Sequence, residues 1–156
     1  IADIILKAID LEIKDIIETA HNFIDFEDRI IRKGAIRSYK GERMIIPFNM
    51  RDGLLICEGK SNPDWNFSAP HGAGRLMSRT DAKKKITIEK YRKDMEDAGV
   101  YSTSICAATL DEAPDAYKDP KIIEEAIEPT AKILDKVKPI INIKDDTSGK
   151  KKKKSE

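Results

Sequence analysis

Residues 43–59, RMIIPFNMRDGLLICEG, decide the fold class, because two short apolar runs lie on either side of the turn signal Asp52-Gly53. Short apolar runs bounded by turn residues are typical of β-strands. The same pattern continues over residues 29–67, with further turn signals at Lys40-Gly41 and at residues 61–64. We therefore predict a set of strands in this region, several of them antiparallel.

Helices are predicted on both sides of the strand region. From Ile1 to about Ala20, isoleucines recur at helical spacing with charged residues between them, which predicts an amphipathic helix ending near His21-Asn22. The elements expected downstream are helices at 76–84 and 88–97, a strand at 100–105, a loop at 109–120, helical residues 121–137 interrupted at Pro129, and a final strand at 139–143. The predicted fold class is α+β, with mixed or antiparallel strands and flanking helices.

Length and composition exclude several classes of protein. The chain has 156 residues, enough for one domain, and its 40% hydrophobic and 37% charged residues do not fit a disordered chain. No apolar run approaches the roughly 18 residues of a membrane-spanning helix, and nothing at the start indicates a targeting peptide. Two cysteines, Cys57 and Cys106, exclude a disulfide-stapled scaffold. We expect a soluble, cytoplasmic protein without membrane partners, and a disordered Lys-rich tail at 145–156.

The net charge of +1 conceals a strong separation of charge along the chain. Residues 29–93 carry 16 basic and 6 acidic side chains, and all eight arginines lie among them. Arginine binds phosphate oxygens with two parallel hydrogen bonds, so this region is the candidate anion-binding part of the chain. The alternative is that a strand-rich region simply has charged outer faces.

His71 is the main candidate for chemistry, because it begins the glycine-rich element His71-Gly72-Ala73-Gly74-Arg75. The three amides after His71 form a plausible anion-binding nest, and glycines permit close backbone approach to a ligand. Arg75 and Arg79, four residues apart, share a helix face if the helix begins early enough. The competing interpretation is a surface or capping histidine beside a turn.

His21-Asn22 and the cysteines are weaker candidates when judged from the residues alone. His21 suits a metal ligand and Asn22 a phosphate contact, but a helix-terminal His-Asn pair is also typical of a C-cap. Cys57 lies in an apolar run and is predicted to be a core residue rather than a nucleophile, while Cys106 is uncommitted. The lysines at 150–154 suit either weak nucleic-acid binding or a solubilising terminus.

The element SAPHGAGRLMSR at residues 68–79, with RKGAIRSYKGE before it and YSTSICAATLDEAPDAYK after it, closely resembles the RtcB family of RNA ligases. The resemblance covers about residues 19–144 and follows the family's C-terminal portion. The matching motifs in chain order are His21-Asn22, Arg32-Lys33-Gly34-Ala35, residues 71–79, Asp111-Glu112-Ala113-Pro114 and Lys144. The fold implied for residues 1–144 is the C-terminal part of an RtcB-like catalytic domain.

The resemblance implies a ligase that uses GTP and two Mn²⁺ ions in tRNA splicing or RNA repair. By carry-over, His71 attacks the α-phosphate of GTP and becomes guanylylated. The guanylate then passes to an RNA 3′-phosphate, generated from a 2′,3′-cyclic phosphate end, and an incoming 5′-hydroxyl displaces GMP. A neutral imidazole nitrogen is a competent nucleophile, and metal ions neutralise phosphate charge, so this chemistry suits the residues.

The resemblance also implies roles for other residues. His21 is the implied manganese ligand and Asn22 the contact to the nucleotide phosphates. The remaining implied contacts are Gly72, Ala73 and Gly74 to GMP through the backbone, Tyr117 and Lys144 in the guanine pocket, Pro47, Phe48, Asn49 and Met50 in a nucleotide-binding loop, and Arg75 and Arg79 to RNA phosphates. In that loop many family members have a PGSMG-like sequence, whereas here Asn49 stands in place of serine and Asp52 is a candidate for one of the contacts.

Length is the larger departure from the family. Full members are considerably longer, and their N-terminal part supplies the Asp, Cys and His ligands that complete the metal pair. We therefore expect this piece to be inactive alone and to need the missing N-terminal half, with archease as a further possible partner. The rival hypotheses are a noncatalytic RNA-binding or structural remnant, and a generic nucleotide-phosphate enzyme with a histidine nucleophile.

Overall fold

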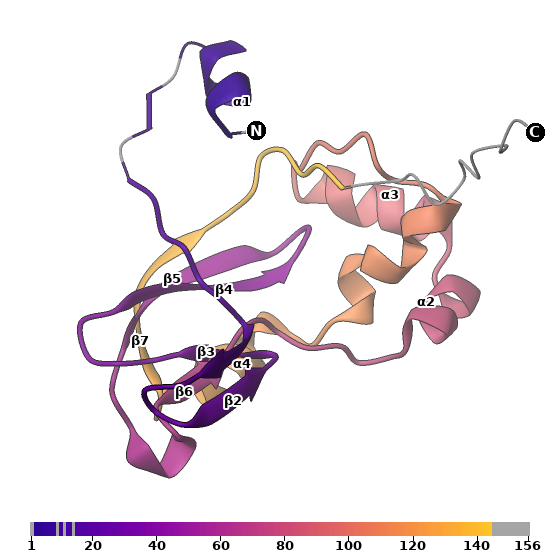
Figure 1. Ribbon diagram of the computed structural model, residues 1–156. Helices are drawn as coiled ribbons and strands as arrows, with labels where there is room; N and C mark the ends of the chain where they lie inside the picture. Colours follow the sequence, from indigo (N-terminus) through magenta and orange to yellow (C-terminus); the bar gives the residue numbers. More distant parts are fainter. Residues whose placement is uncertain (1, 9, 11, 14, 145–156) are drawn as a thin grey trace, which may run out of the picture.

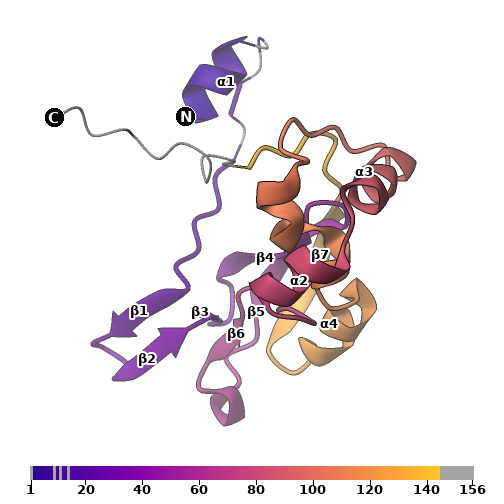
Figure 2. The same cartoon turned by 90° about the vertical axis from the view of Figure 1, so that its right-hand side faces the viewer.

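The computed structural model describes residues 2–8, 10, 12–13 and 15–144. The first element, α1 (Ala2–Ala8), is much shorter than the helix predicted to reach Ala20, and that prediction is wrong for the described residues 10, 12–13 and 15–20. In both Figure 1 and Figure 2, α1 lies away from the sheets and from the other helices. Ile4, Ile13 and Ile16 are exposed, so the isoleucine stripe has no core in this structure against which a longer helix could pack. The tail at 145–156 lies outside the described residues.

Three small antiparallel sheets form the strand region, which confirms the α+β prediction. β1 (Asn22–Asp25) pairs with β2 (Ile30–Lys33), and β3 (Ala35–Arg37) pairs with β6 (Ser68–Pro70). The third sheet has the order β4-β5-β7 and consists of β4 (Arg43–Asn49), β5 (Gly53–Gly59) and β7 (Ala131–Val137). Because Asn22 begins β1, His21-Asn22 is not a helix C-cap.

The larger apolar core is formed by residues of β4 and β5 together with residues of α4 and of the strands beside them. Met44, Ile46 and Phe48 alternate along β4 and are buried, as the period of two in a half-buried strand requires. Ile127 and α4 (Pro120–Ala126) close this core. Cys57 is fully buried within it, as predicted, and burial raises the pKa of its thiol to about 11.

The helical part of the chain packs around a second core. Its elements are α2 (Arg79–Lys85), α3 (Ile88–Asp97), η2 (Ala107–Glu112) and η3 (Pro114–Ala116). The short η1 (Pro63–Trp65), on the connection before β6, contributes no residue to this core. Ser78 and Thr87 accept hydrogen bonds from backbone amides as N-caps of α2 and α3. The helix at 88–97 is thus confirmed, whereas α2 begins at Arg79 rather than near Leu76.

Four predictions for residues 100–143 are wrong in whole or in part. Residues 131–137 form the strand β7 rather than helix, because their backbone pairs with β5 from Leu54↔Val137 to Gly59↔Ala131. Neither 100–105 nor 139–143 is a strand, and the two segments meet only through a bridge between Tyr101 and Ile141. Within 109–120, predicted as loop, parts of the chain form η2 and η3. Among the helices that the structure describes, none is long and apolar enough to cross a membrane.

Candidate nucleotide site

A cavity of about 420 Å³ opens where the β4–β5 turn, the His71 element, η2 and the end of the described chain meet. We call it the glycine pocket. It is lined by Pro47, Phe48, Asn49, Met50, His71, Gly72, Ala73, Gly74, Arg75, Arg79, Glu112, Tyr117, Asn142 and Lys144. Its volume lies within the usual range for small-ligand sites. Twelve of these residues are sequence candidates, and they come from segments about 100 residues apart.

The ring of His71 is oriented by the backbone of Gly34. His71 Nδ1 lies 2.8 Å from the Gly34 carbonyl oxygen, and the His71 amide donates to the same oxygen at 3.3 Å. A carbonyl oxygen can only accept, so Nδ1 carries the proton, and in the neutral form of the ring the lone pair lies on Nε2. Gly34 has φ +67°, the left-handed region that favours glycine, so this turn depends on glycine at position 34.

His21 and Asn22 meet His71 through this same turn. The imidazole rings of His21 and His71 stack with centroids 4.7 Å apart and an interplanar angle of 9°. Gly34 N–H donates to the side-chain oxygen of Asn22 at 3.0 Å and to the carbonyl of His21 at 2.9 Å. The structure therefore brings together the two histidines that sequence reasoning had singled out separately. Asn22 supports the Gly34 turn and does not itself line the pocket.

The amides after His71 do not form a free three-membered nest. Ala73 N–H donates to the Pro47 carbonyl at 3.0 Å, which leaves the amides of Gly72 and Gly74 as candidates for an anion. A Cβ on Gly72 would meet the same Pro47 oxygen at 3.0 Å, so the close approach of β4 excludes a larger residue at ordinary contact distance.

The loop at 47–52 is closed by its own side chains. Asn49 accepts hydrogen bonds from the amides of Arg51 and Asp52, both at 2.9 Å, and donates to the Asp52 carboxylate at 2.7 Å. Arg51 also pairs with Asp52, at 2.8 Å. Asp52 is held in these contacts and does not line the pocket, whereas Asn49 does. Asn49, which stands where many family members have serine, thus closes the turn through hydrogen bonds within the loop.

Arg75 and Arg79 share partners rather than a helix face, because only Arg79 belongs to α2. Arg75 donates to the Tyr117 hydroxyl at 3.1 Å and to the Asp111 carbonyl, with its guanidinium 4.9 Å from the centre of the Tyr117 ring. Arg79 contacts the carboxylates of Asp111 at 2.7 Å and Glu112 at 3.2 Å. The side chain of Arg79 remains 69% exposed, so it is the more accessible of the two to an added phosphate.

Glu112 joins these groups to Lys144, and sequence reasoning assigned it no role. Its carboxylate accepts from the Tyr117 hydroxyl at 2.7 Å and from Lys144 at 3.2 Å. Burial acts to raise the pKa of Glu112, but the Tyr117 hydrogen bond and the Lys144 charge outweigh it and hold that pKa below its usual value. Burial, with the Glu112 contact, raises the pKa of Tyr117 to about 12. Glu112 stands inside the motif Asp111-Glu112-Ala113-Pro114, the sequence signal that could have identified it.

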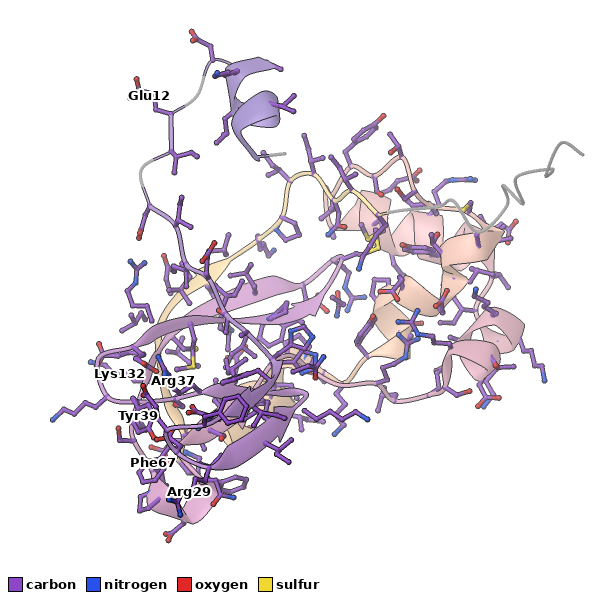
Figure 3. All side chains as sticks on the ribbon, viewed as in Figure 1. Glu12, Arg29, Arg37, Tyr39, Phe67 and Lys132 are labelled. Carbon is purple, nitrogen blue, oxygen red and sulfur yellow. The ribbon has the colours of Figure 1, made fainter. Side chains whose placement is uncertain are left out.

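Most other arginines of the basic segment are used within the fold. The ion pairs are Arg32–Asp25 at 2.9 Å, Arg37–Glu42 at 2.7 Å, Arg51–Asp52 at 2.8 Å, and Arg43–Asp15. Figure 3 shows Arg37, Tyr39 and Phe67 together, where Tyr39 stacks on Phe67 at 5.3 Å and Arg37 lies over the Tyr39 ring. A second cavity of about 480 Å³ includes Arg37 and Arg43 together with Glu18 and Glu42. Arginine clustering in sequence therefore did not mean one basic surface.

The residues present do not fit a two-metal centre. Across 2–8, 10, 12–13 and 15–144 there is no group of three or more His, Cys, Asp or Glu side chains placed to hold a metal ion. His21 supplies one imidazole beside the pocket, and a ligand sphere for Mn²⁺ needs several further donors.

The glycine pocket thus combines an oriented imidazole nitrogen with a lysine and two arginines, residue types that suit phosphate-containing ligands. Comparison with known proteins is more specific: residues 1–145 match the family model described as tRNA-splicing ligase RtcB. The chain belongs to the RtcB family.

Three relatives illustrate the match. The chain is 30% identical to the RNA-splicing ligase RtcB of Escherichia coli (strain K12) over 139 residues, which is 80% of this chain and 31% of that protein. It is 31% identical to the tRNA-splicing ligase RtcB of Aeropyrum pernix, covering 70% of this chain and 28% of the relative. For the tRNA-splicing ligase RtcB of Nanoarchaeum equitans the identity is 30%, covering 89% and 35%. The chain thus spans about a third of the length of these curated relatives.

Proposed function

We propose that this chain is the catalytic portion of an RNA ligase that joins RNA 3′-phosphate or 2′,3′-cyclic phosphate ends to 5′-hydroxyl ends in tRNA splicing or RNA repair. The observation that carries the proposal is the hydrogen bond from His71 Nδ1–H to the Gly34 carbonyl. It fixes the tautomer that leaves Nε2 as a nucleophile on a ring lining the glycine pocket. The names of the relatives support the same class of activity.

In the proposed first step, Nε2 of His71 attacks the α-phosphate of GTP. An N–P bond forms, the bond to the leaving oxygen breaks, and pyrophosphate departs with its electron pair. An oxygen of the RNA 3′-phosphate then attacks the guanylate phosphorus, and the N–P bond to His71 breaks. In the last step the 5′-hydroxyl oxygen of the second strand attacks the 3′-phosphate, loses its proton to solvent and displaces GMP. The Gly34 carbonyl, by accepting the Nδ1 proton's hydrogen bond, stabilises the positive charge that develops on the imidazole during attack.

The other candidates take supporting roles in this proposal. Gly72 and Gly74 offer amides to the nucleotide phosphate, and Tyr117 and Lys144 receive the guanine. Pro47, Phe48, Asn49 and Met50 form the adjoining wall, while Ala73 fastens the His71 element to it. Arg79, exposed at the start of α2, is assigned to RNA phosphate together with Arg75.

His21 is the proposed manganese ligand, and the relatives' greater length supports a further source of ligands for two Mn²⁺ ions. A bound metal ion would supply neutralisation of the charge on the attacked phosphate. Because the described residues do not supply a complete ligand set, we propose that the chain is inactive until joined to the missing N-terminal portion, with archease as a candidate helper. Its proposed location is the cytoplasm.

The test is covalent labelling of protein with α-labelled GTP and Mn²⁺. The chain is assayed alone and joined to the N-terminal portion of a family member, with an intact family member in parallel. Label in the joined protein that is lost in His71→Ala supports the ligase. No label in the joined protein, while the intact member is labelled, refutes it and favours a noncatalytic remnant. Label from ATP equal to that from GTP favours a generic nucleotide enzyme.

Arg79→Ala separates RNA binding from guanylylation in the joined protein. We expect it to spare guanylylation more than strand joining, because Arg79 is the more exposed of the two arginines. Arg75→Ala is a less selective probe, since Arg75 also holds the Tyr117 hydroxyl. Equal loss of both steps in Arg79→Ala refutes its assignment to RNA.

A further inference from the structure

Glu112 is the one carboxylate among the described residues that line the glycine pocket. It faces three cations of the same lining: Arg79 at 3.2 Å, Lys144 at 3.2 Å and Arg75 at 3.9 Å. It also accepts the hydrogen bond from Tyr117 at 2.7 Å. Its side chain is 16% exposed, so these contacts are only weakly screened by solvent.

Both carboxylate oxygens of Glu112 are already engaged. Oε2 receives Tyr117 and Lys144, while Oε1 faces the two arginines. A carboxylate in this state has little capacity left for a ligand, and an unpaired one would repel a phosphate. The contacts therefore favour a role through its neighbours rather than on the reacting atoms.

Tyr117 and Lys144 reach the pocket from separate parts of the chain. Tyr117 follows η3, whereas Lys144 ends the described chain and is held there by Ser104, whose hydroxyl donates to the Lys144 carbonyl at 2.7 Å. The Ser104 contact fixes the backbone of Lys144 but leaves four rotatable side-chain bonds free. Glu112 is the contact that fixes the ammonium end.

We propose that Glu112 is a positioning residue that holds the Tyr117 hydroxyl and the Lys144 ammonium in place on the wall that receives the base of the nucleotide. Its effect is on nucleotide affinity, not on the attack by His71. This inference rests on the proposed function, since that function names the occupant of the pocket. The contacts of Glu112 with Tyr117 and Lys144 lie within this chain, so the effect of Glu112 on Tyr117 can be measured without any ligand.

The first arm of the test uses the 156-residue chain with ¹³C-labelled tyrosine, whose ring signal reports ionisation of the hydroxyl. Comparison with Tyr117→Phe assigns the signal. Because Glu112 contributes to raising the pKa of Tyr117, Glu112→Gln should lower that pKa, while burial continues to hold it above the ordinary value. Glu96→Gln, an exposed substitution of the same kind on α3, is the matched control and should leave it unchanged.

The second arm measures the rate of guanylylation against GTP concentration in the joined protein. Glu112→Gln should raise the half-saturating GTP concentration about tenfold and leave the maximal rate within about threefold, because positioning acts on binding. Lys144→Met should produce a similar change. The losses in the double variant should be less than additive, because either substitution removes the Glu112–Lys144 contact, whereas only Glu112→Gln removes the charged partner of Tyr117.

The outcomes are distinguishable. An unchanged Tyr117 pKa in Glu112→Gln overturns the positioning role, as does a collapse of the maximal rate with an unchanged GTP dependence. Additive losses in the double variant overturn the link to Lys144. If the unsubstituted joined protein forms no adduct, the ligase proposal fails, while a lowered Tyr117 pKa still supports the positioning of Tyr117 by Glu112.

Discussion

Replacing Gly53 by alanine tests the close packing of the β4–β5 turn against β7. Gly53 has φ +83°, and a Cβ built there would lie 2.0 Å from the carbonyl oxygen of Val137 and 3.0 Å from Pro139. Contacts below 3.0 Å essentially never occur for real Cβ atoms, so the turn and the end of β7 must separate by about 1 Å or more. The backbone of β7 cannot rotate out of the way as a flexible side chain could.

The expected loss of stability has two parts. The left-handed backbone conformation costs about 1–2 kcal/mol for a residue with a Cβ. Relief of the overlap costs a further 1–3 kcal/mol, roughly the range for overpacked sites. Gly53→Ala should therefore lower the free energy of unfolding by about 2–5 kcal/mol, a large share of what a domain of this size usually has.

Gly41→Ala is the matched control, because Gly41 has φ +85° but no atom within 4 Å of an added Cβ. It should lose only the conformational part, about 1–2 kcal/mol. The assay is urea unfolding of both variants and the parent, monitored by circular dichroism and accepted only if the denaturant slopes agree. Equal losses in the two variants would refute the packing argument, since the backbone strain is nearly the same at both positions.

Three further predictions follow from the described contacts. Cys57 should react with a thiol reagent at pH 8 only after unfolding, because burial raises its pKa to about 11; fast labelling of Cys57 in the native protein would contradict this. Burial acts to raise the pKa of Asp111, but its contacts with Lys83 and Arg79 hold that pKa below the ordinary value. The ionised Asp111 should therefore stabilise the folded chain above about pH 4, and this contribution should be lost as the pH falls further. In Asp111→Asn, the free energy of unfolding measured with urea should therefore fall less between pH 6 and pH 3 than in the parent. An equal fall in both proteins would refute the pairing. Ser104→Ala should cost about 1 kcal/mol and speed hydrogen exchange of the Lys144 amide, which donates to the Ser104 hydroxyl at 3.2 Å; unchanged exchange would show that another contact holds the segment.

Elements with local signals could be predicted from the sequence. The strands around Asp52-Gly53 carry their own turn, and the helix at 88–97 has a cap at Thr87 and an apolar face that buries Tyr91 and Met95. Each of these signals lies within a few residues of the element it specifies.

Elements specified by distant partners could not be predicted in this way. In β7 only Ala131 is buried, so its sequence shows no alternation, and pairing with β5 alone makes it a strand. The prediction for the first helix was too long for the opposite reason. The isoleucines have helical spacing, but Ile4, Ile13 and Ile16 are exposed and do not pack on a core.

In the candidate site, too, features with a local sequence signal could be predicted and features that depend on distant residues could not. His71 and its glycines were recognisable because they are contiguous, and the tyrosine and lysine came from the family resemblance. The orientation of His71 by Gly34 and the shared role of Glu112 depend on a backbone carbonyl and on convergence in space, which no linear pattern displays.

The pairing of β5 with β7 also governs when this chain can fold. Leu54 of β5 pairs with Val137 of β7, which lies 83 residues later in the chain. During synthesis, one edge of β5 therefore has no partner strand until nearly all described residues have been made. A chain that stops before Ala131 would leave backbone N–H and C=O groups along one edge of β5 unpaired, as a template for strand addition by other molecules. Premature termination in this region should therefore yield aggregates rather than a shortened, folded product.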